Sequence, residues 1–316
     1  MSEVAMLHQE LSAFLDMVDE RRQSGRPALH ELSVERAREE FEAASQALKA
    51  GAPRIPVEQL ELELPGRTLP ARLYRPTPQS SAPVVLYFHG GGYVVGSLES
   101  HDGLCRTLAE ACGCTVLAVG YRLAPEHPLP AAPDDARAAW EWLRVRAAGL
   151  GIDPTRVAVA GDSAGATLAS VLAAQLAAEG GPLPCAQLLF YPAVDAQDGS
   201  ESRELFADGY LLESATLEWF YRQYAPEQSQ RCDWHCSPLY AGERLRGSAA
   251  ALLLIAEFDP LVDEGLAYAK ALQEQGVDVE VTLCRGLTHD FLRMSSLLPD
   301  VAAYFHQIAR FLRERW

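Results

Sequence analysis

The chain has 316 residues, of which 48% are hydrophobic and 22% charged, so it can bury one large core or two modest ones. Its formal net charge at pH 7 is −16, and no cluster of Lys and Arg stands out. Such a chain is repelled by nucleic-acid phosphates and by anionic lipid surfaces, so we expect no nucleic acid and no membrane among its partners.

The N-terminal segment is acidic and lacks both the basic start and the unbroken apolar stretch of a signal peptide. The seven cysteines, an odd number, are scattered: Cys105, Cys112, Cys114, Cys185, Cys232, Cys236 and Cys284. This usage predicts reduced thiols in the cytoplasm rather than a disulfide framework. The close pairs at positions 112/114 and 232/236 leave zinc ligation as an alternative, but small buried thiols are common and we expect no metal.

Helical periodicity comes first along the chain. Apolar residues recur at helical spacing over residues 6–22 and 33–49 and predict two amphipathic helices. Their apolar faces consist of Leu7, Leu11, Phe14 and Val18 in the first helix and of Val34, Phe41, Ala44 and Leu48 in the second. After Gly51 the period changes to the alternation that is typical of paired strands.

From residue 57 onwards, strand-like and helix-like segments take turns. The predicted strands cover residues 57–65, 69–76, 82–90, 114–122, 156–161, 186–192, 250–259 and 279–284, and the predicted helices cover residues 104–112, 133–148, 164–178 and 262–276. Most of the strands are apolar on both faces, which predicts a mostly parallel sheet flanked by helices, the α/β class. Residues 196–235 interrupt the alternation with a polar and aromatic stretch that contains a predicted helix near residues 214–224.

The segment Gly161-Asp162-Ser163-Ala164-Gly165 lies between an apolar strand and an alanine-rich helix. A serine at such a strand-turn-helix junction is typical of a hydrolase nucleophile, whereas a small residue in a tight bend is the structural alternative. Glycines two residues before and after the serine avoid crowding in a sharp turn. The first N–H groups of the following helix point toward whatever the serine attacks.

A second motif, His89-Gly90-Gly91-Gly92-Tyr93, ends the apolar run of residues 82–90. Three consecutive glycines let the bare backbone approach a substrate, and their N–H groups can bind an oxygen that becomes negative in a tetrahedral intermediate. A flexible glycine turn is the alternative.

Joined by the segment Tyr121-Arg122-Leu123-Ala124-Pro125-Glu126-His127-Pro128, these two motifs resemble the hormone-sensitive-lipase-like family of α/β-hydrolases, the bacterial family IV carboxylesterases. The resemblance extends from about residue 73 to residue 291. It implies an α/β-hydrolase fold, with a mostly parallel central sheet flanked by helices and a helical cap. It also implies a serine carboxylesterase that needs neither a cofactor nor a metal.

The family further implies an acid after a late strand and a histidine after the last one. Asp259 and His289 occupy these places, and the chain order of Ser163, Asp259 and His289 is that of α/β-hydrolases. His289 would take the serine proton, and Asp259 would orient the imidazole. The N–H groups that would bind the oxyanion are those of Gly91, Gly92 and Ala164.

Other acidic residues compete for the role of Asp259. Asp263 lies four residues later in a predicted helix, so we expect its side chain to face away. Asp290 adjoins His289 and would have to fold back on its neighbour. The pair Asp134-Asp135 begins a predicted helix and suits the helix dipole better than a metal ion.

The remaining predictions concern domains and substrate. Residues 1–50 and 196–235 are expected to form the helical cap, and residues 51–195 and 236–316 the α/β-hydrolase catalytic domain. Three aromatic residues are predicted to bind the substrate: Tyr93, Trp219 and Tyr224. His101 and His127 are predicted to be hydrogen-bonded structural residues.

The sequence thus predicts a cytoplasmic serine carboxylesterase that hydrolyses short- to medium-chain acyl esters, small molecules, through an acyl-enzyme. A receptor that has lost catalysis on the same fold is one alternative, and the presence of His289 favours the enzyme. A lipase at lipid surfaces and an amide-cleaving relative are further alternatives. The sequence leaves a homodimer open.

Overall fold

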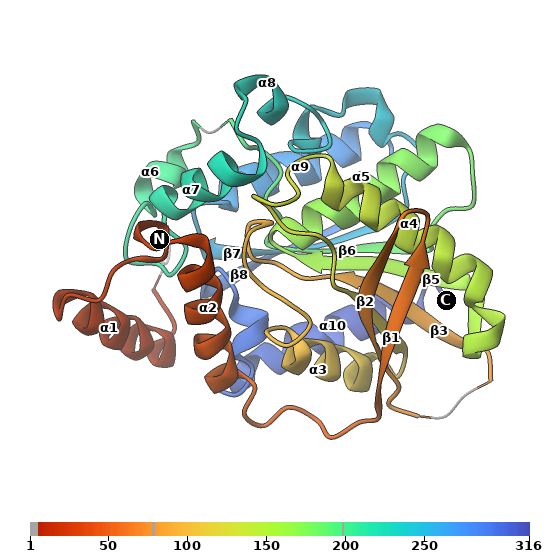
Figure 1. The fold of residues 1–316 in the computed structure, drawn as a ribbon, viewed down its shortest axis with the longest axis horizontal. Coiled ribbons are helices and arrows are strands. Elements are labelled where there is room, and N and C mark those ends of the chain that lie inside the picture. The colour runs from red at the N-terminus through yellow and green to blue at the C-terminus, as the bar shows by residue number, and fades with distance from the viewer. Residues whose placement is uncertain (1–5, 78–79, 198) are drawn as a thin grey trace, which may run out of the picture.

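The computed structural model describes residues 6–77, 80–197 and 199–316. These residues form an eight-stranded sheet with the strand order β1-β2-β4-β3-β5-β6-β7-β8 (Figure 1). The strands are β1 Val57–Leu64, β2 Arg67–Tyr74, β3 Ala82–Phe88, β4 Thr115–Val119, β5 Ile152–Asp162, β6 Ala186–Phe190, β7 Ala251–Phe258 and β8 Val279–Thr288. β1 pairs antiparallel with β2, and β2 with β4, whereas the pairs from β4 across to β8 are parallel.

Helices cover both faces of this sheet, with α4, α5 and α9 on one face and α3 and α10 on the other (Figure 1). The α-helices are α1 Gln9–Gln23, α2 Val34–Leu48, α3 Asp102–Cys112, α4 Ala131–Arg146, α5 Ala164–Glu179, α6 Glu201–Leu205, α7 Ser214–Tyr224, α8 Gln228–Arg231, α9 Val262–Glu274 and α10 Ala302–Arg313. Short 3₁₀ helices are η1 Leu29–Glu31, η2 Ala148–Leu150, η3 Pro238–Tyr240, η4 Gly242–Leu245, η5 Phe291–Met294 and η6 Pro299–Val301.

The two layers of helices explain why the central strands are apolar on both faces. Every residue of β3 is buried; Val84 and Leu86 belong to the core beneath α4 and α5, and Val85 and Tyr87 to the core beneath α3 and α10. The predicted mostly parallel, helix-flanked sheet is confirmed. Its parallel strands bring their carboxyl ends to one edge, where the loops after β3, β5, β7 and β8 begin.

The predicted N-terminal helices need two corrections. α1 begins at Gln9, so Leu7 precedes the helix. In α2 the predicted core position Ala44 is exposed, whereas Ala37 and Ser45 are buried, because the face of α2 that packs on the protein runs at i, i+4 and i+8.

The C-terminal helix α10 was absent from the sequence prediction. It buries Phe305, Ile308 and Leu312, which recur at helical spacing, so the same periodicity argument could have located it.

The pair of acids at the start of α4 also differs from the prediction. Asp135 is fully buried, and its carboxylate accepts hydrogen bonds from Arg122 (2.8 Å) and from Arg67. The buried charge is therefore compensated by an ion-pair network rather than chiefly by the helix dipole, while Asp134 is exposed.

The N-terminal segment packs against the inserted segment that contains α6, α7 and α8, although the two lie far apart in the sequence (Figure 1). Arg22 at the end of α1 forms an ion pair with Asp208 at 2.9 Å and a second one with Glu213. Nδ1 of His30 in η1 lies 3.0 Å from the Thr216 hydroxyl in α7. These contacts join two segments that lie outside the sheet.

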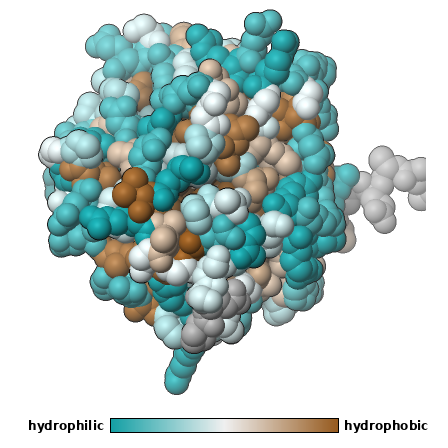
Figure 2. Space-filling view, turned by 90° about the vertical axis from the view of Figure 1, so that its right-hand side faces the viewer, coloured by the Kyte–Doolittle hydropathy of each residue, from teal (hydrophilic) through white to brown (hydrophobic). Residues whose placement is uncertain are grey.

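Figure 2 shows the face of the molecule that lies to the right in Figure 1, where hydrophobic side chains form small separate groups among hydrophilic ones. Such scattered exposure is normal for a folded chain. Among the helices of the described residues, none combines the length and the apolar character that crossing a membrane requires.

Candidate active site

Ser163 lies in the turn between β5 and α5 with a strained backbone, at φ 53° and ψ −122°. The turn is held from both sides, because the Ser163 N–H donates to the Phe190 carbonyl at 2.9 Å and its own carbonyl accepts from Ala166 N–H at 3.0 Å. A Cβ on Gly161 would overlap the backbone of Gly165, and a Cβ on Gly165 would overlap the backbone of Phe88. The two flanking glycines therefore permit the close approach that this turn requires.

His289 follows β8 and contacts an acid that follows β7. Its Nδ1 donates to Oδ2 of Asp259 at 2.7 Å, and both side chains are buried. Oδ1 of Asp259 accepts from the Leu261 N–H at 2.9 Å, which holds the carboxylate in the loop. The ring of Tyr191 meets the imidazole edge to face, with ring centroids 4.7 Å apart.

The electrostatic surroundings of His289 favour its protonated form. Burial alone lowers the pKa of the imidazole, but the charge of Asp259 and the hydrogen bond to it offset this effect, so the pKa lies above its ordinary value of 6.5. The described structure contains no hydrogen bond between the Ser163 hydroxyl and His289, and such contacts are often long until a substrate binds.

The other acidic residues considered for the triad form hydrogen bonds or ion pairs with groups other than His289. The Asp263 carboxylate accepts from the Ser202 N–H at 2.9 Å, and Asp290 forms an ion pair with Arg293 at 2.8 Å. Glu257, two residues before Asp259, accepts from the Gly286 N–H of β8 at 2.8 Å. The structure thus brings His289 together with Asp259.

The glycine loop after β3 presents unpaired amides beside Ser163. Gly91 and Gly92 have positive φ angles of 114° and 59°. Within the described chain, no acceptor is bonded to the N–H groups of Gly91, Gly92 or Ala164, whereas the neighbouring Gly90 N–H donates to Asp162 Oδ1 at 3.0 Å. Free N–H groups beside a serine can bind an anionic oxygen.

Sequence reasoning missed the role of Asp162, which precedes Ser163 and is fully buried. Its carboxylate accepts from the Tyr87 hydroxyl, from Gly90 N–H, and from His101 Nε2 at 3.1 Å. Burial alone would raise its pKa, but the neighbouring His101 and the Tyr87 hydroxyl hold that pKa well below the usual range. The carboxylate therefore links the serine turn to the glycine loop.

His101 is the hydrogen-bonded structural residue that the sequence predicted, since its Nδ1 also lies 2.9 Å from the Ser100 hydroxyl. The side chain of His127 is exposed instead.

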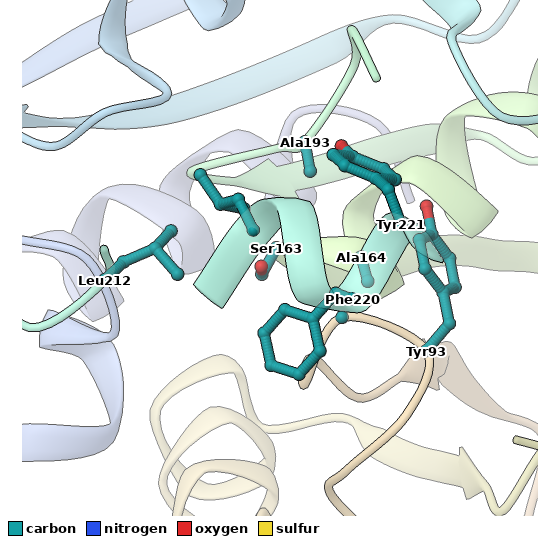
Figure 3. A pocket seen from close by; sticks show the side chains of 9 residues that line it. Tyr93, Ser163, Ala164, Ala193, Leu212, Phe220 and Tyr221 are labelled. Carbon is teal, nitrogen blue, oxygen red and sulfur yellow. The ribbon is translucent and has the colours of Figure 1, made fainter. Parts of the chain in front are cut away.

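A small, partly open cavity lies beside Ser163. Figure 3 shows Phe220, Tyr221, Tyr93 and Leu212 around the serine. The lining residues are Gly92, Tyr93, Ser163, Ala164, Ala193, Leu212, Leu217, Phe220 and Tyr221. Most of the wall is apolar, and α7 supplies three of its residues.

Of the three residues predicted to bind the substrate, Tyr93 lines this cavity, whereas Trp219 and Tyr224 do not. Trp219 is buried on another side of α7, with its ring centroid 5.3 Å from that of Phe220, and Tyr224 stacks on Tyr93 at 3.7 Å. The aromatic lining from α7 comes from Phe220 and Tyr221.

A buried ion pair anchors the inserted segment beside this cavity. Arg203 of α6 donates to Glu264 of α9 at 2.8 Å, and both side chains are about 4% exposed. Glu264 also accepts from the N–H groups of Val194 (2.7 Å) and Asp195 (3.1 Å), next to the lining residue Ala193. Burial raises the pKa of Glu264 to about 7, against the opposing charge of Arg203.

We expect the Arg203→Met variant to lose stability, by about 3–5 kcal/mol at pH 8, because it leaves a buried carboxylate without its cation. The folded-state pKa of Glu264 already exceeds the ordinary 4.5, and loss of Arg203 raises it further. The folded state then binds the proton more tightly than the unfolded state, so stability decreases as pH rises through this range. Melting temperatures should therefore fall more at pH 8 than at pH 5. The control is Arg222→Met, an exposed arginine of α7; an equal loss in both variants would contradict the prediction.

The described residues contain no group of three or more His, Cys, Asp or Glu side chains arranged to hold a metal ion. All seven cysteines are free thiols.

Comparison with known proteins matches residues 85–293 to a family described as having the alpha/beta hydrolase fold. Ethyl acetate hydrolase of Pseudomonas putida is 48% identical over 302 residues, which cover 93% of this chain and 94% of that protein. Carboxylic ester hydrolase LipN of Mycobacterium tuberculosis is 43% identical over 270 residues, covering 83% and 71% of the two chains.

Solved structures of ester hydrolases have the same fold. An ester-hydrolase from the metagenome of Lake Arreo, complexed with a derivative of bipyridine phosphonate, is 37% identical and superposes with a TM-score of 0.93 over 97% of this chain and 98% of that chain. An esterase of Pyrobaculum calidifontis is 35% identical with a TM-score of 0.90, covering 98% of both chains.

Fold and site together define an α/β-hydrolase. Within that class, the chain belongs to the hormone-sensitive-lipase-like family, the bacterial family IV carboxylesterases. It is a carboxylic ester hydrolase.

Proposed function

We propose that Ser163, His289 and Asp259 form the catalytic triad of this ester hydrolase. The observation that carries the proposal is the buried 2.7 Å hydrogen bond between His289 and Asp259, at the sheet edge where Ser163 occupies its strained turn. A serine hydroxyl is a weak nucleophile unless a base removes its proton, and an oriented, neutral imidazole supplies that base.

In the proposed reaction, the Ser163 oxygen attacks the ester carbonyl while Nε2 of His289 takes the hydroxyl proton. Asp259 keeps the other ring proton on Nδ1 and stabilises the imidazolium. The tetrahedral intermediate collapses when His289 gives its proton to the departing alcohol, and an acyl-serine is left. Water, activated by His289 in the same way, then releases the carboxylic acid.

The amides of Gly91, Gly92 and Ala164 are proposed to bind the oxygen that becomes negative in each tetrahedral intermediate. Support comes from their N–H groups, which have no acceptor in the described part of the protein. Loss of one donor of this kind typically lowers the rate by about 10²- to 10³-fold.

We further propose that residues 6–50, 196–197 and 199–235 form a cap over the site; residues 1–5 and 198 of the predicted cap lie outside the described residues. The ion pairs of Arg22 with Asp208 and Glu213 support this division, because they join the two segments to each other. Leu212, Leu217 and Phe220 of the inserted segment close one side of the cavity. Cytoplasmic location and homodimer formation stay predictions from the sequence.

A bounded apolar cavity favours short- to medium-chain acyl groups. Each buried CH₂ contributes about 0.8 kcal/mol, and this gain ends where the cavity wall is reached. Tyr93 is proposed as a substrate contact, joined by Phe220 and Tyr221. The name of the Pseudomonas relative, ethyl acetate hydrolase, supports a short acyl group.

The substrate class is tested by kcat/KM for p-nitrophenyl esters from acetate to palmitate. We expect an optimum at or below about eight acyl carbons and a decline beyond it, because longer chains meet the wall of the cavity. The Phe220→Ala variant should shift this optimum to longer chains. Trp219→Phe should leave it unchanged, because Trp219 does not line the cavity.

A continued rise to palmitate, or a jump in rate once the substrate forms an emulsion, would instead favour a lipase. Equal effects of the two α7 variants would contradict the assignment of Phe220 to the acyl site.

A further inference from the structure

A buried arginine lies four residues after His289 and contacts three separate parts of the chain. Arg293 in η5 forms an ion pair with Asp290 at 2.8 Å, and it donates to the Ser100 carbonyl at 3.4 Å in the loop before α3. Its side chain is only 4% exposed. An arginine this deeply buried must be held by several partners, because an uncompensated buried charge is costly.

The third contact comes from the N-terminal helix α2. The Arg293 guanidinium lies 4.7 Å from the ring centroid of Phe41 and donates a hydrogen bond to the Ser45 hydroxyl. Phe41 and Ser45 are one helical turn apart, and the Ser45 hydroxyl donates to the Phe41 carbonyl at 2.6 Å. The guanidinium therefore lies between α2 and residues 289–293, which we call the His289 loop.

Asp290 links Arg293 to His289. It adopts the left-handed backbone conformation with φ 66°, directly after His289, and its Oδ2 is the atom that Arg293 binds. A non-glycine residue in this conformation needs surrounding contacts to hold it. Loss of Arg293 would free the turn that carries the imidazole.

Arg293 also interacts with carboxylates that act on His289. The imidazole is hydrogen-bonded to Asp259 after β7 and packs against the phenol of Tyr191 after β6. The charges of Asp290 after β8 and of Asp162 at the end of β5 also act on it. The three carboxylates raise the pKa of His289, and two of them, Asp290 and Asp162, also interact with Arg293. The Asp162 carboxylate also accepts hydrogen bonds from His101 Nε2 and from the Tyr87 hydroxyl.

We propose that Arg293 is a positioning residue, which docks the N-terminal helix α2 onto the His289 loop and offsets the carboxylates around the imidazole. The inference rests on the proposed role of His289. Through Arg293, the packing of α2 controls both the placement and the basicity of the histidine, although no residue of α2 is part of the triad.

The charge effect predicts shifts of opposite sign in two variants. Arg293→Met removes the cation, so the carboxylates act on the imidazole without compensation and the acid limb of the kcat/KM profile moves to higher pH. Asp290→Asn removes one carboxylate and moves the same limb to lower pH; asparagine tolerates the left-handed turn. The double variant should lie between the two. Loosened packing alone would lower the rate without this reversal of sign.

The positioning effect is measured as kcat/KM on the high-pH plateau of the pH profile, where His289 is neutral in every variant. We expect Arg293→Met to lose roughly 10- to 100-fold in plateau kcat/KM, the size that a small displacement of a catalytic group produces. Arg293→Lys keeps the charge and should restore the pH profile but not the whole plateau, because an ammonium cannot make the same forked contacts. The matched control is Arg313→Met, an exposed arginine of α10.

Coupling to α2 is tested by a double-mutant cycle. Phe41→Leu should lower kcat/KM in the natural protein and have little further effect in Arg293→Met, because the contact is already lost. Additive effects would show that α2 acts on the site by another route.

Titration of His289 by NMR in the same variants gives a readout that does not depend on turnover. Unchanged titration and pH profiles in both Arg293→Met and Asp290→Asn would overturn the inference, even where Ser163→Ala confirms the triad. Conversely, full activity of Ser163→Ala would overturn the proposed function while the NMR shifts still report on Arg293.

Discussion

Replacement of Ser163 by alanine is expected to lower kcat by about six orders of magnitude, the loss that follows removal of the nucleophile from a comparable triad. The reason is chemical, because the proposed route passes through an acyl-serine and alanine has no oxygen to form it. An organophosphonate ester should label the natural protein once, on the peptide that contains Ser163, and should not label the variant. Mass spectrometry measures the label, and burst-corrected kinetics measure the residual rate.

The chain offers a matched serine as the control. Ser170 is buried in α5, the helix that begins beside Ser163, and its hydroxyl lies 2.6 Å from that of Tyr268. Ser170→Ala loses a buried hydrogen bond, worth about 1 kcal/mol of stability, but should keep labelling and turnover. If Ser163→Ala remains active, or if the label lies on another residue, the proposed nucleophile is wrong.

The second large effect concerns the acid. Asp259→Asn is expected to lower kcat by about 10⁴-fold, as in the comparable change in a serine protease, because an amide at this position favours the wrong tautomer of the histidine. The substitution keeps the size of the side chain and the acceptor for the Leu261 N–H, so the fold should persist. Circular dichroism and the melting temperature check the fold, and steady-state kinetics measure the loss.

Asp263→Asn is the matched control, because Asp263 accepts from the Ser202 N–H instead of from the histidine. Its effect on kcat should be mild. A reversal of the two results would transfer the role of the acid to Asp263, contrary to the 2.7 Å contact of Asp259 with His289.

Much of the fold could be predicted because its signals are local. Continuous apolar runs mark the parallel strands, and helical spacing marks the helices between them. The ends of the elements differ from the prediction: β5 begins at Ile152, four residues before the predicted start, because its pairing with β3 extends to that residue. Pairing with a neighbouring strand is not visible in a run of residues.

The candidate site could be located for the same local reason. The strand-turn-helix motif around Ser163 and the glycine motif after β3 each consist of adjacent residues. Parallel strands bring their carboxyl ends, and therefore both motifs, to one edge of the sheet. Asp259 and His289 each follow a predicted strand, at the places where the family resemblance implies an acid and a histidine. Their hydrogen bond was then observed in the structure.

The amino-acid sequence by itself therefore determined the fold class and located the serine turn, since each depends on short segments with strong local constraints. The family resemblance added Asp259 and His289 as the proposed partners of the serine. Only the tertiary structure decided which side of α7 lines the cavity, because Trp219 and Phe220 are adjacent aromatic residues and the packing of α7 determines which of them faces the cavity. It alone also joined Arg293 to Ser45, 248 residues away, because such contacts arise from packing between helices and loops and leave no periodic signal in the chain.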